Sequence, residues 1–197
     1  MSQGPVTGGL SIGEKLKVLR TSRGTSLDEL ARQVDLTPAV ISQIERDVTT
    51  PPVGTLVKLA HALQVNVSYF FDEKPSEIKV EVVRANERKR IRRSLSHRQG
   101  ALSYAYESLA FRKSDKKMEP FLIELDIDID EDLPALEHEG EEFLFVLEGE
   151  VEAKIDDKII LLKQGDSLYF ESQVPHALKG RGHTKPKALV VLYTSDA

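Results

Sequence analysis

The side chains able to bind metals, transfer protons or contact phosphates limit the chemistry of this chain. The sequence contains five histidines and no cysteine. A disulfide framework, a zinc ribbon and a thiolate nucleophile are therefore excluded, and any bound metal would need histidine or carboxylate ligands. No apolar stretch approaches the roughly 18 residues that suggest a membrane span. We therefore expect a cytoplasmic protein without a membrane partner.

Charge is distributed unevenly along the 197 residues, whose total net charge is -5. Residues 1–75 are neutral overall, residues 76–100 carry a net charge of +5, and residues 101–197 carry -10. The phosphate backbone of DNA repels an acidic segment. Any contact with DNA would therefore fall in the first half of the chain.

The spacing of apolar residues changes between the two halves. In the first half they recur every three or four residues, which predicts helices over residues 12–23, 26–34, 37–46 and 55–63 and a short fifth turn over 68–71. The second half contains seven short apolar runs about ten residues apart, separated by turn residues, which is typical of a β-sandwich or barrel. We expect a helical domain over residues 10–72, a basic linker over 73–100 and an all-β domain over 101–197.

Capping signals mark two consecutive helices in the first half. Ser26 with Glu29 fits a capping box, and Thr37 precedes Pro38, which is tolerated at a first helical position. Two capped helices separated by a short turn have the geometry that places the second in a DNA major groove. This region resembles the phage-repressor, or Xre, type of helix-turn-helix in the small residue Ala31 and in the apolar residues Leu30, Val34, Ile41, Ile44, Leu56 and Leu59.

The resemblance implies that residues 37–46 form the recognition helix. Gln43 is the candidate for base specificity, because its amide can pair with adenine N6 and N7. Residues at and beyond the helix end would contact phosphates and position the protein. Any one of these polar residues alone also fits a solvated helix face. The DNA-binding candidates are Thr37, Pro38, Ala39, Ser42, Gln43, Arg46, Thr49 and Thr50.

The same resemblance assigns Arg20 and Glu45 to a structural ion pair between the first and third helices. A nearly neutral domain should bind DNA weakly as a monomer, since phosphate neutralisation supplies most non-specific affinity. We therefore expect a homodimer on double-stranded DNA, with two recognition helices about 34 Å apart on a palindromic operator.

The basic run from Arg88 to Arg98 has two interpretations. It is either a linker that tracks phosphates or an arm packed along the acidic second domain. Ile91 and Leu95 are four residues apart and would bury one side of such an arm, which favours the second interpretation.

Residues 136–180 resemble the cupin family in His138, Glu142, Gly149, the Gly165–Asp166 turn and the Pro175–His176 pair. The resemblance implies a multidomain α plus β fold. An N-terminal all-α, five-helix, lambda-repressor-like domain would precede a C-terminal all-β double-stranded β-helix, the cupin barrel. It also implies a divalent metal on His138, Glu142 and His176. Leu136 stands where metal-binding cupins have a further histidine, so the ligand set is incomplete and the cofactor stays unknown.

Without a metal, the same three residues define a polar patch in an apolar barrel, as small-ligand sites are usually built. Tyr104 and Tyr106 alternate along one expected strand, so both point to the same side of the sheet. They either line the wall of an effector site or pack against the linker. The carboxylates of Glu137, Glu139 and Glu141 either solvate a strand end or favour a cationic effector.

These features predict a sequence-specific transcriptional regulator whose cupin barrel binds a small-molecule effector that modulates DNA binding. The alternative is a metal-dependent cupin enzyme, a dioxygenase or isomerase, that carries a DNA-binding domain. The missing histidine at Leu136 and the absence of another recognisable acid-base pair argue against catalysis. A third hypothesis is an antitoxin-like DNA binder whose barrel recognises a protein.

Overall fold

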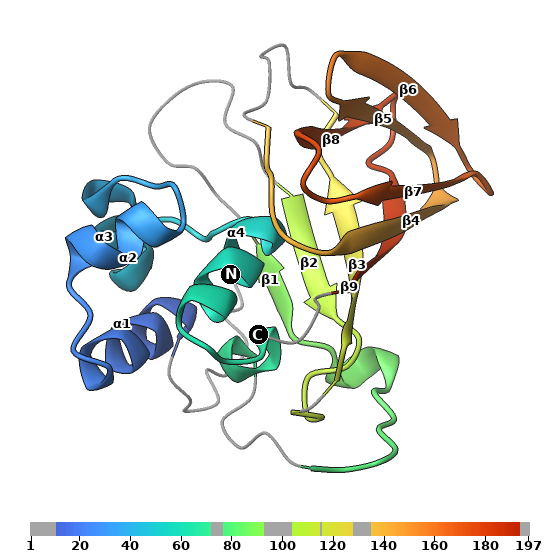
Figure 1. Cartoon of the computed structure of the whole chain (residues 1–197). Coiled ribbons are helices and arrows are strands. Elements are labelled where there is room, and N and C mark those ends of the chain that lie inside the picture. Colours follow the sequence, from blue (N-terminus) through green and yellow to red (C-terminus); the bar gives the residue numbers. More distant parts are fainter. Residues whose placement is uncertain (1–10, 72–76, 93–103, 115, 128–134, 194–197) are drawn as a thin grey trace, which may run out of the picture.

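A computed structural model describes residues 11–71, 77–92, 104–114, 116–127 and 135–193. The helices gather on one side of the molecule and the strands on the other (Figure 1). The helical part comprises α1 (Ile12–Ser22), α2 (Leu27–Gln33), α3 (Pro38–Glu45) and α4 (Val53–Ala62), followed by the 3-10 turn η1 (Val67–Phe70). The expected fifth helix is thus a single 3-10 turn, and the described residues form four α-helices. None of these helices is long and apolar enough to cross a membrane.

Local sequence signals explain where three of the helices begin. Ser11 with Glu14 and Ser26 with Glu29 form capping boxes at α1 and α2. The Thr37 side chain accepts a hydrogen bond from the Val40 N–H at the start of α3. These side chains satisfy donors that the first turn of a helix leaves unpaired.

An apolar core and one ion pair hold the helices of this domain together. Leu16, Leu30, Ile41, Ile44, Leu56 and Leu59 are almost completely buried. The Arg20 guanidinium on α1 lies 2.5 Å from the Glu45 carboxylate on α3. It also donates to the Thr25 carbonyl oxygen at 2.8 Å. The ion pair expected between the first and third helices is therefore present and largely buried.

The strands form two antiparallel sheets in the order β1-β2-β3-β9-β4-β7 and β6-β5-β8. Nine strands occur in the described ranges, two more than the sequence predicted. The added strands are β1, within the basic run, and β8, which begins at His176. The bounds are β1 Arg90–Arg92, β2 Tyr104–Ser108, β3 Met118–Leu125, β4 Glu141–Glu148, β5 Glu150–Ile155, β6 Lys158–Lys163, β7 Ser167–Glu171, β8 His176–Arg181 and β9 Lys187–Tyr193.

The described part of the basic run packs against the sheet. A 3-10 turn, η2 (Ala85–Glu87), precedes it. Arg90 on β1 contacts Glu107 at 3.4 Å and Glu124 at 2.8 Å, and Arg88 lies 3.6 Å from Glu107. For these arginines the structure agrees with the packed-arm interpretation. Leu95 and Arg98 lie outside the described residues.

The two halves share one continuous core. Phe71, just after η1, contacts Tyr106 on β2 and Phe121 on β3, with ring centroids 6.2 Å and 5.7 Å apart. The Tyr106 hydroxyl donates to the Pro51 carbonyl oxygen at 3.2 Å. The helical domain therefore packs directly on the sheet at β2 and β3.

Candidate functional site

Three residues that the cupin resemblance selected converge in the barrel. His138 precedes β4, Glu142 is the second residue of β4, and His176 begins β8. The bridge between Leu136 and His176 aligns the first segment with β8. Antiparallel pairing thus brings together side chains that lie far apart in sequence.

The three side chains point their ligand atoms at one another. Glu142 Oε2 lies 3.6 Å from His138 Nε2 and 3.8 Å from His176 Nε2. One ligand atom from each residue lies within 4.8 Å of the other two. All three residues are buried, with at most 5% of their surface exposed. A single small ion or ligand atom would contact all of them.

Backbone carbonyls fix the orientation of both imidazoles. His138 Nδ1 contacts the Glu139 carbonyl oxygen at 3.1 Å, and His176 Nδ1 contacts the Val174 carbonyl oxygen at 2.9 Å. A carbonyl oxygen accepts only, so each Nδ1 carries a proton, and in the neutral form of an imidazole held this way Nε2 presents a lone pair. Burial lowers the pKa of His176, although the nearby Glu142 carboxylate opposes the effect. His176 is therefore neutral at physiological pH.

This donor set fits a divalent metal. Two imidazole nitrogens and one carboxylate suit iron, manganese, nickel or zinc and leave coordination positions open. Hydrogen bonds from the remote imidazole nitrogens to carbonyls are usual around metal-ligating histidines. His138 Nε2 is buried and has no hydrogen-bond partner within the described residues. A metal would satisfy that atom.

Helix α4 of the helical domain begins against this cluster. A Cβ added at Gly54 would lie 3.0 Å from His138 Cδ2, 3.4 Å from His138 Nε2 and 3.4 Å from Leu136 Cδ1. Gly54 and Leu136 were not among the expected site residues. Their proximity to His138 depends on how the domains pack, which no local sequence signal indicates.

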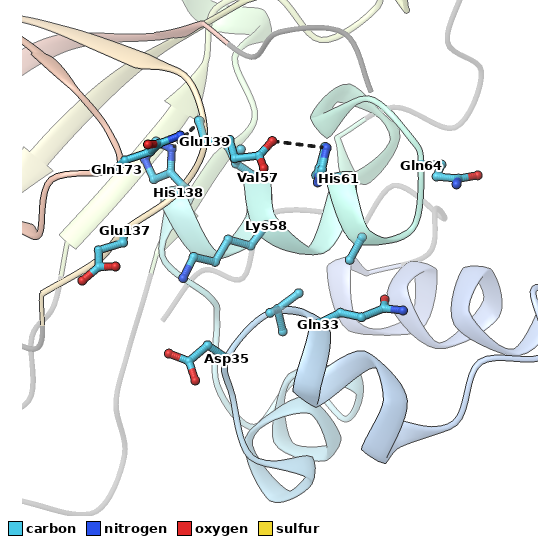
Figure 2. Close-up of a pocket in the computed structure, with 12 residues that line it drawn as sticks. Gln33, Asp35, Val57, Lys58, His61, Gln64, Glu137, His138, Glu139 and Gln173 are labelled. Carbon is cyan, nitrogen blue, oxygen red and sulfur yellow. Dashed lines mark hydrogen bonds and ion pairs between the residues drawn. The ribbon is translucent and has the colours of Figure 1, made fainter.

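A cavity of about 900 Å³ lies between the two domains and reaches His138. Figure 2 shows residues of α2 and α4 facing the segment that carries His138. His61 on α4 lies 3.5 Å from the Glu139 carboxylate across this cavity. Its lining residues are Gln33, Val34, Asp35, Val57, Lys58, His61, Ala62, Gln64, Glu137, His138, Glu139 and Gln173. The cavity extends from His138 to Asp35 in the turn between α2 and α3.

The structure places Tyr106 away from an effector-site wall. Its ring is fully buried between Phe71 and Phe121, and its hydroxyl is bonded to Pro51. Tyr106 therefore belongs to the core between the domains, which leaves no room for a ligand beside its ring. The side chain of Tyr104 lies outside the described part of the chain.

The predicted recognition helix is α3, on the side of the helical domain away from the strands (Figure 1). Thr37, Pro38, Ala39, Gln43 and Arg46 are exposed, and Ser42, Thr49 and Thr50 are partly buried. Thr37 caps the helix, while Thr49 and Thr50 line a second cavity of about 430 Å³. The exposed residues of α3 form one accessible face.

Comparison with known proteins identifies both domains. Residues 16–70 match the helix-turn-helix family, and residues 124–193 match the family described as cupin domain. The chain is 28% identical over 171 residues to the HTH-type transcriptional regulator PuuR of Escherichia coli, covering 86% of this chain and 87% of PuuR. A solved HTH-family transcriptional regulator from Vibrio cholerae shares 27% identity, with a TM-score of 0.65 over 93% of this chain and 95% of that chain.

Two other relatives match over less than half of this chain. The uncharacterized HTH-type transcriptional regulator RP497 of Rickettsia prowazekii is 38% identical to this chain over 61 residues. That match covers 31% of this chain and 47% of RP497. The (S)-2-hydroxypropylphosphonic acid epoxidase of Streptomyces wedmorensis is 38% identical over 90 residues, 42% of this chain and 46% of the epoxidase. PuuR and the Vibrio cholerae protein, each matched over most of both chains, are described as transcriptional regulators.

Proposed function

We propose that this chain, which joins a helix-turn-helix domain to a cupin domain and is homologous to HTH-type transcriptional regulators, is a ligand-controlled transcriptional regulator. One observation carries the proposal: α3 follows α2 through a tight turn, lies on the side of the helical domain away from the strands (Figure 1), and has exposed polar and small residues. A helix held in this way can enter a DNA major groove.

The exposed residues at α3 would make different kinds of contact with DNA. Gln43 would read adenine through its amide, and Pro38 and Ala39 would make apolar contacts to base edges, such as a thymine methyl group. Arg46, just after α3, would contact phosphate and position the helix. Thr37, Ser42, Thr49 and Thr50 complete the proposed surface.

A homodimer would double this surface. The helical domain is nearly neutral, so one copy neutralises few phosphates and should bind weakly. Two copies would place their α3 helices about 34 Å apart and read a palindromic operator.

The cluster of His138, Glu142 and His176 would be the sensor. The two Nε2 atoms and the carboxylate would hold a divalent metal, which as a Lewis acid would bind a polar group of the effector. An effector that prefers one arrangement of the domains shifts the population towards it, and DNA affinity changes with that shift.

The test measures, by fluorescence anisotropy, the affinity of the protein for DNA from the region upstream of its gene. Each titration is made with and without candidate metabolites. Gln43→Ala should lose about 1–3 kcal/mol of specific affinity and relax the preference at one base pair. Gln164→Ala, an exposed change at the turn between β6 and β7, serves as control. Absence of specific binding under every condition would refute the proposal.

A metal-dependent enzyme is the second candidate, because two histidines and one carboxylate with open positions also occur in iron oxygenases. The similarity to the epoxidase over 90 residues supports it. Here Glu142, His138 and His176 would hold the metal, and Gly54 and Leu136 would restrict the space beside it. Dialysed protein that retains no stoichiometric iron or manganese would exclude this candidate.

A further inference from the structure

The six-stranded sheet carries apolar side chains on both of its faces. Phe121 of β3, Val190 of β9 and Leu144 of β4 pair across neighbouring strands, so they point to the same face. All three are buried, which makes this the inner face of the sheet. Successive side chains of a strand point to opposite faces. The residues that alternate with these three therefore lie on the outer face.

A row of apolar residues crosses the outer face of four neighbouring strands. The row consists, in register, of Pro120 on β3, Val191 on β9, Phe143 on β4 and Tyr169 on β7. The first three are partly exposed, and Tyr169 on the edge strand is 62% exposed. None of the four belongs to the core that the two domains share.

A second apolar row lies beside the first. It consists of Leu122, Leu189 and Phe145, all partly exposed. Met118 pairs with Tyr193 on the other side of the first row, and these two residues are 63% and 38% exposed. The two rows and this pair form one surface, the outer apolar face.

The outer apolar face is large for a surface in contact with water. Four strands about 4.8 Å apart, over about six residues that each rise about 3.3 Å, cover a flat area of roughly 400 Å². Side chains that stand on the sheet give more accessible surface than this projection. The largest apolar patches on monomers cover about 300–600 Å² and often mark a binding site. A standard interface buries about 800 Å² per partner, so this face supplies at least about half of what a stable dimer needs.

We propose that the outer apolar face is the dimer interface of this protein and binds the same face of a second copy. A twofold-symmetric contact requires a patch complementary to itself, and a sheet face of apolar side chains can pack on its own copy in this way. Glu141 and Glu171 stand at one end of the face and would repel DNA, which argues against a nucleic acid as the occupant. The inference rests on the homodimer of the proposed function and names the surface that forms it.

The position of this interface suits a DNA-binding dimer. Phe71 of the helical domain contacts Tyr106 and Phe121, which both lie on the inner face. The outer apolar face is therefore turned away from the helical domain. A second copy bound there would leave α3 of each copy free to contact DNA.

The experiment measures the mass of the full chain in solution by analytical ultracentrifugation over a range of concentrations. Val191→Glu places a charge in the outer apolar face, where a dimer would bury it against apolar groups of the partner. The dissociation constant of the dimer should rise about a hundredfold or more. Ile159→Glu makes the same kind of change at a residue that is 67% exposed on β6, in the other sheet. This control should leave the dissociation constant within about twofold of wild type.

A second variant avoids dependence on one substitution. Leu122→Glu lies on the neighbouring strand β3 and should weaken the dimer in the same way. Circular dichroism checks that both variants are folded, and if one of them fails to fold the other decides. Both variants should keep their affinity for a single DNA half-site within about twofold and lose affinity for the full palindrome, because only a dimer gains from both half-sites.

The outcomes separate this inference from the proposed function. A monomeric wild type overturns the inference, as do variants at Val191 and Leu122 that dimerise as tightly as Ile159→Glu, while DNA recognition by α3 stands. A wild-type dimer that dissociates in both variants supports the inference even when no DNA sequence is bound specifically, which is the result that refutes the proposed function.

Discussion

The Tyr106 hydroxyl on β2 donates a hydrogen bond to the Pro51 carbonyl oxygen, 3.2 Å away, in the segment that leads into α4. Both residues are buried, so this bond fixes the start of α4 on the sheet without help from water. The position of the helical domain over His138 therefore depends partly on a tyrosine of the barrel.

Tyr106→Phe should lower the free energy of unfolding by about 1 kcal/mol, because the buried Pro51 carbonyl loses its donor while the ring keeps its packing. Urea denaturation measures the change. Tyr169→Phe, at a residue that is 62% exposed, is the control and should stay within about 0.5 kcal/mol of wild type. Equal stability of the two variants would show that the bond does not hold the domains together.

Glu45→Gln should destabilise the helical domain by about 2 kcal/mol. The substitution would leave the Arg20 guanidinium without its carboxylate partner. The side chains of Arg20 and Glu45 are only 11% and 6% exposed, so the unpaired charge would be largely buried. Arg20 donates to Glu45, and this hydrogen bond raises the pKa of the arginine in the wild type. Arginine stays protonated in proteins without such a partner as well, so the variant keeps the charge. The change is measured by thermal and urea unfolding, with the exposed Glu171→Gln as reference. A loss no larger than the reference would contradict a structural role.

Glu119 on β3 should make stability depend on pH. Burial raises the pKa of its carboxyl from 4.5 to about 7, even though Lys116 Nζ lies 2.9 Å away. Between those values the folded protein binds the extra proton, so the free energy of unfolding should fall as pH rises from 4.5 towards 7. The contribution is on the order of 3 kcal/mol.

Glu119→Gln should remove this decline, whereas Glu124→Gln, at a partly exposed residue of the same strand, should retain it. Urea denaturation at several pH values compares the slopes. Parallel curves for wild type and Glu119→Gln would show that Glu119 titrates normally.

Divalent metal should raise the thermal stability of the wild type. At a metal concentration about 1,000 times the dissociation constant, the gain is about 4 kcal/mol. Glu142→Gln should abolish most of it by removing a ligand charge. The control is Glu141→Gln, which alters the neighbouring residue on the opposite face of β4. This variant should keep the stabilisation by metal. A metal-induced shift that survives in Glu142→Gln would place the metal elsewhere.

Arg46→Ala should weaken binding to all DNA sequences to a similar extent and reduce the slope of log affinity against log salt by about 1. Anisotropy titrations at several salt concentrations give this slope. Arg32→Ala, an exposed arginine on α2, is the matched control. A sequence-dependent loss in Arg46→Ala would instead assign that side chain to base reading.

The sequence alone determined the features that arise from local interactions. The caps at Ser26 and Thr37 define where α2 and α3 begin, since each cap bonds a backbone N–H three residues away. The family resemblances supplied the Arg20–Glu45 pair and the three residues of the buried cluster. The change from helical to alternating apolar spacing separated the domains.

Only the tertiary structure decided which residues from different domains meet. The alternation of Tyr104 and Tyr106 fixed a common face of a strand but not what covers it, and the structure covers Tyr106 with Phe71. Likewise, Gly54 lies against His138 because two separately patterned cores pack together. Apolar packing is non-directional, so periodicity identifies the buried faces without specifying their partners.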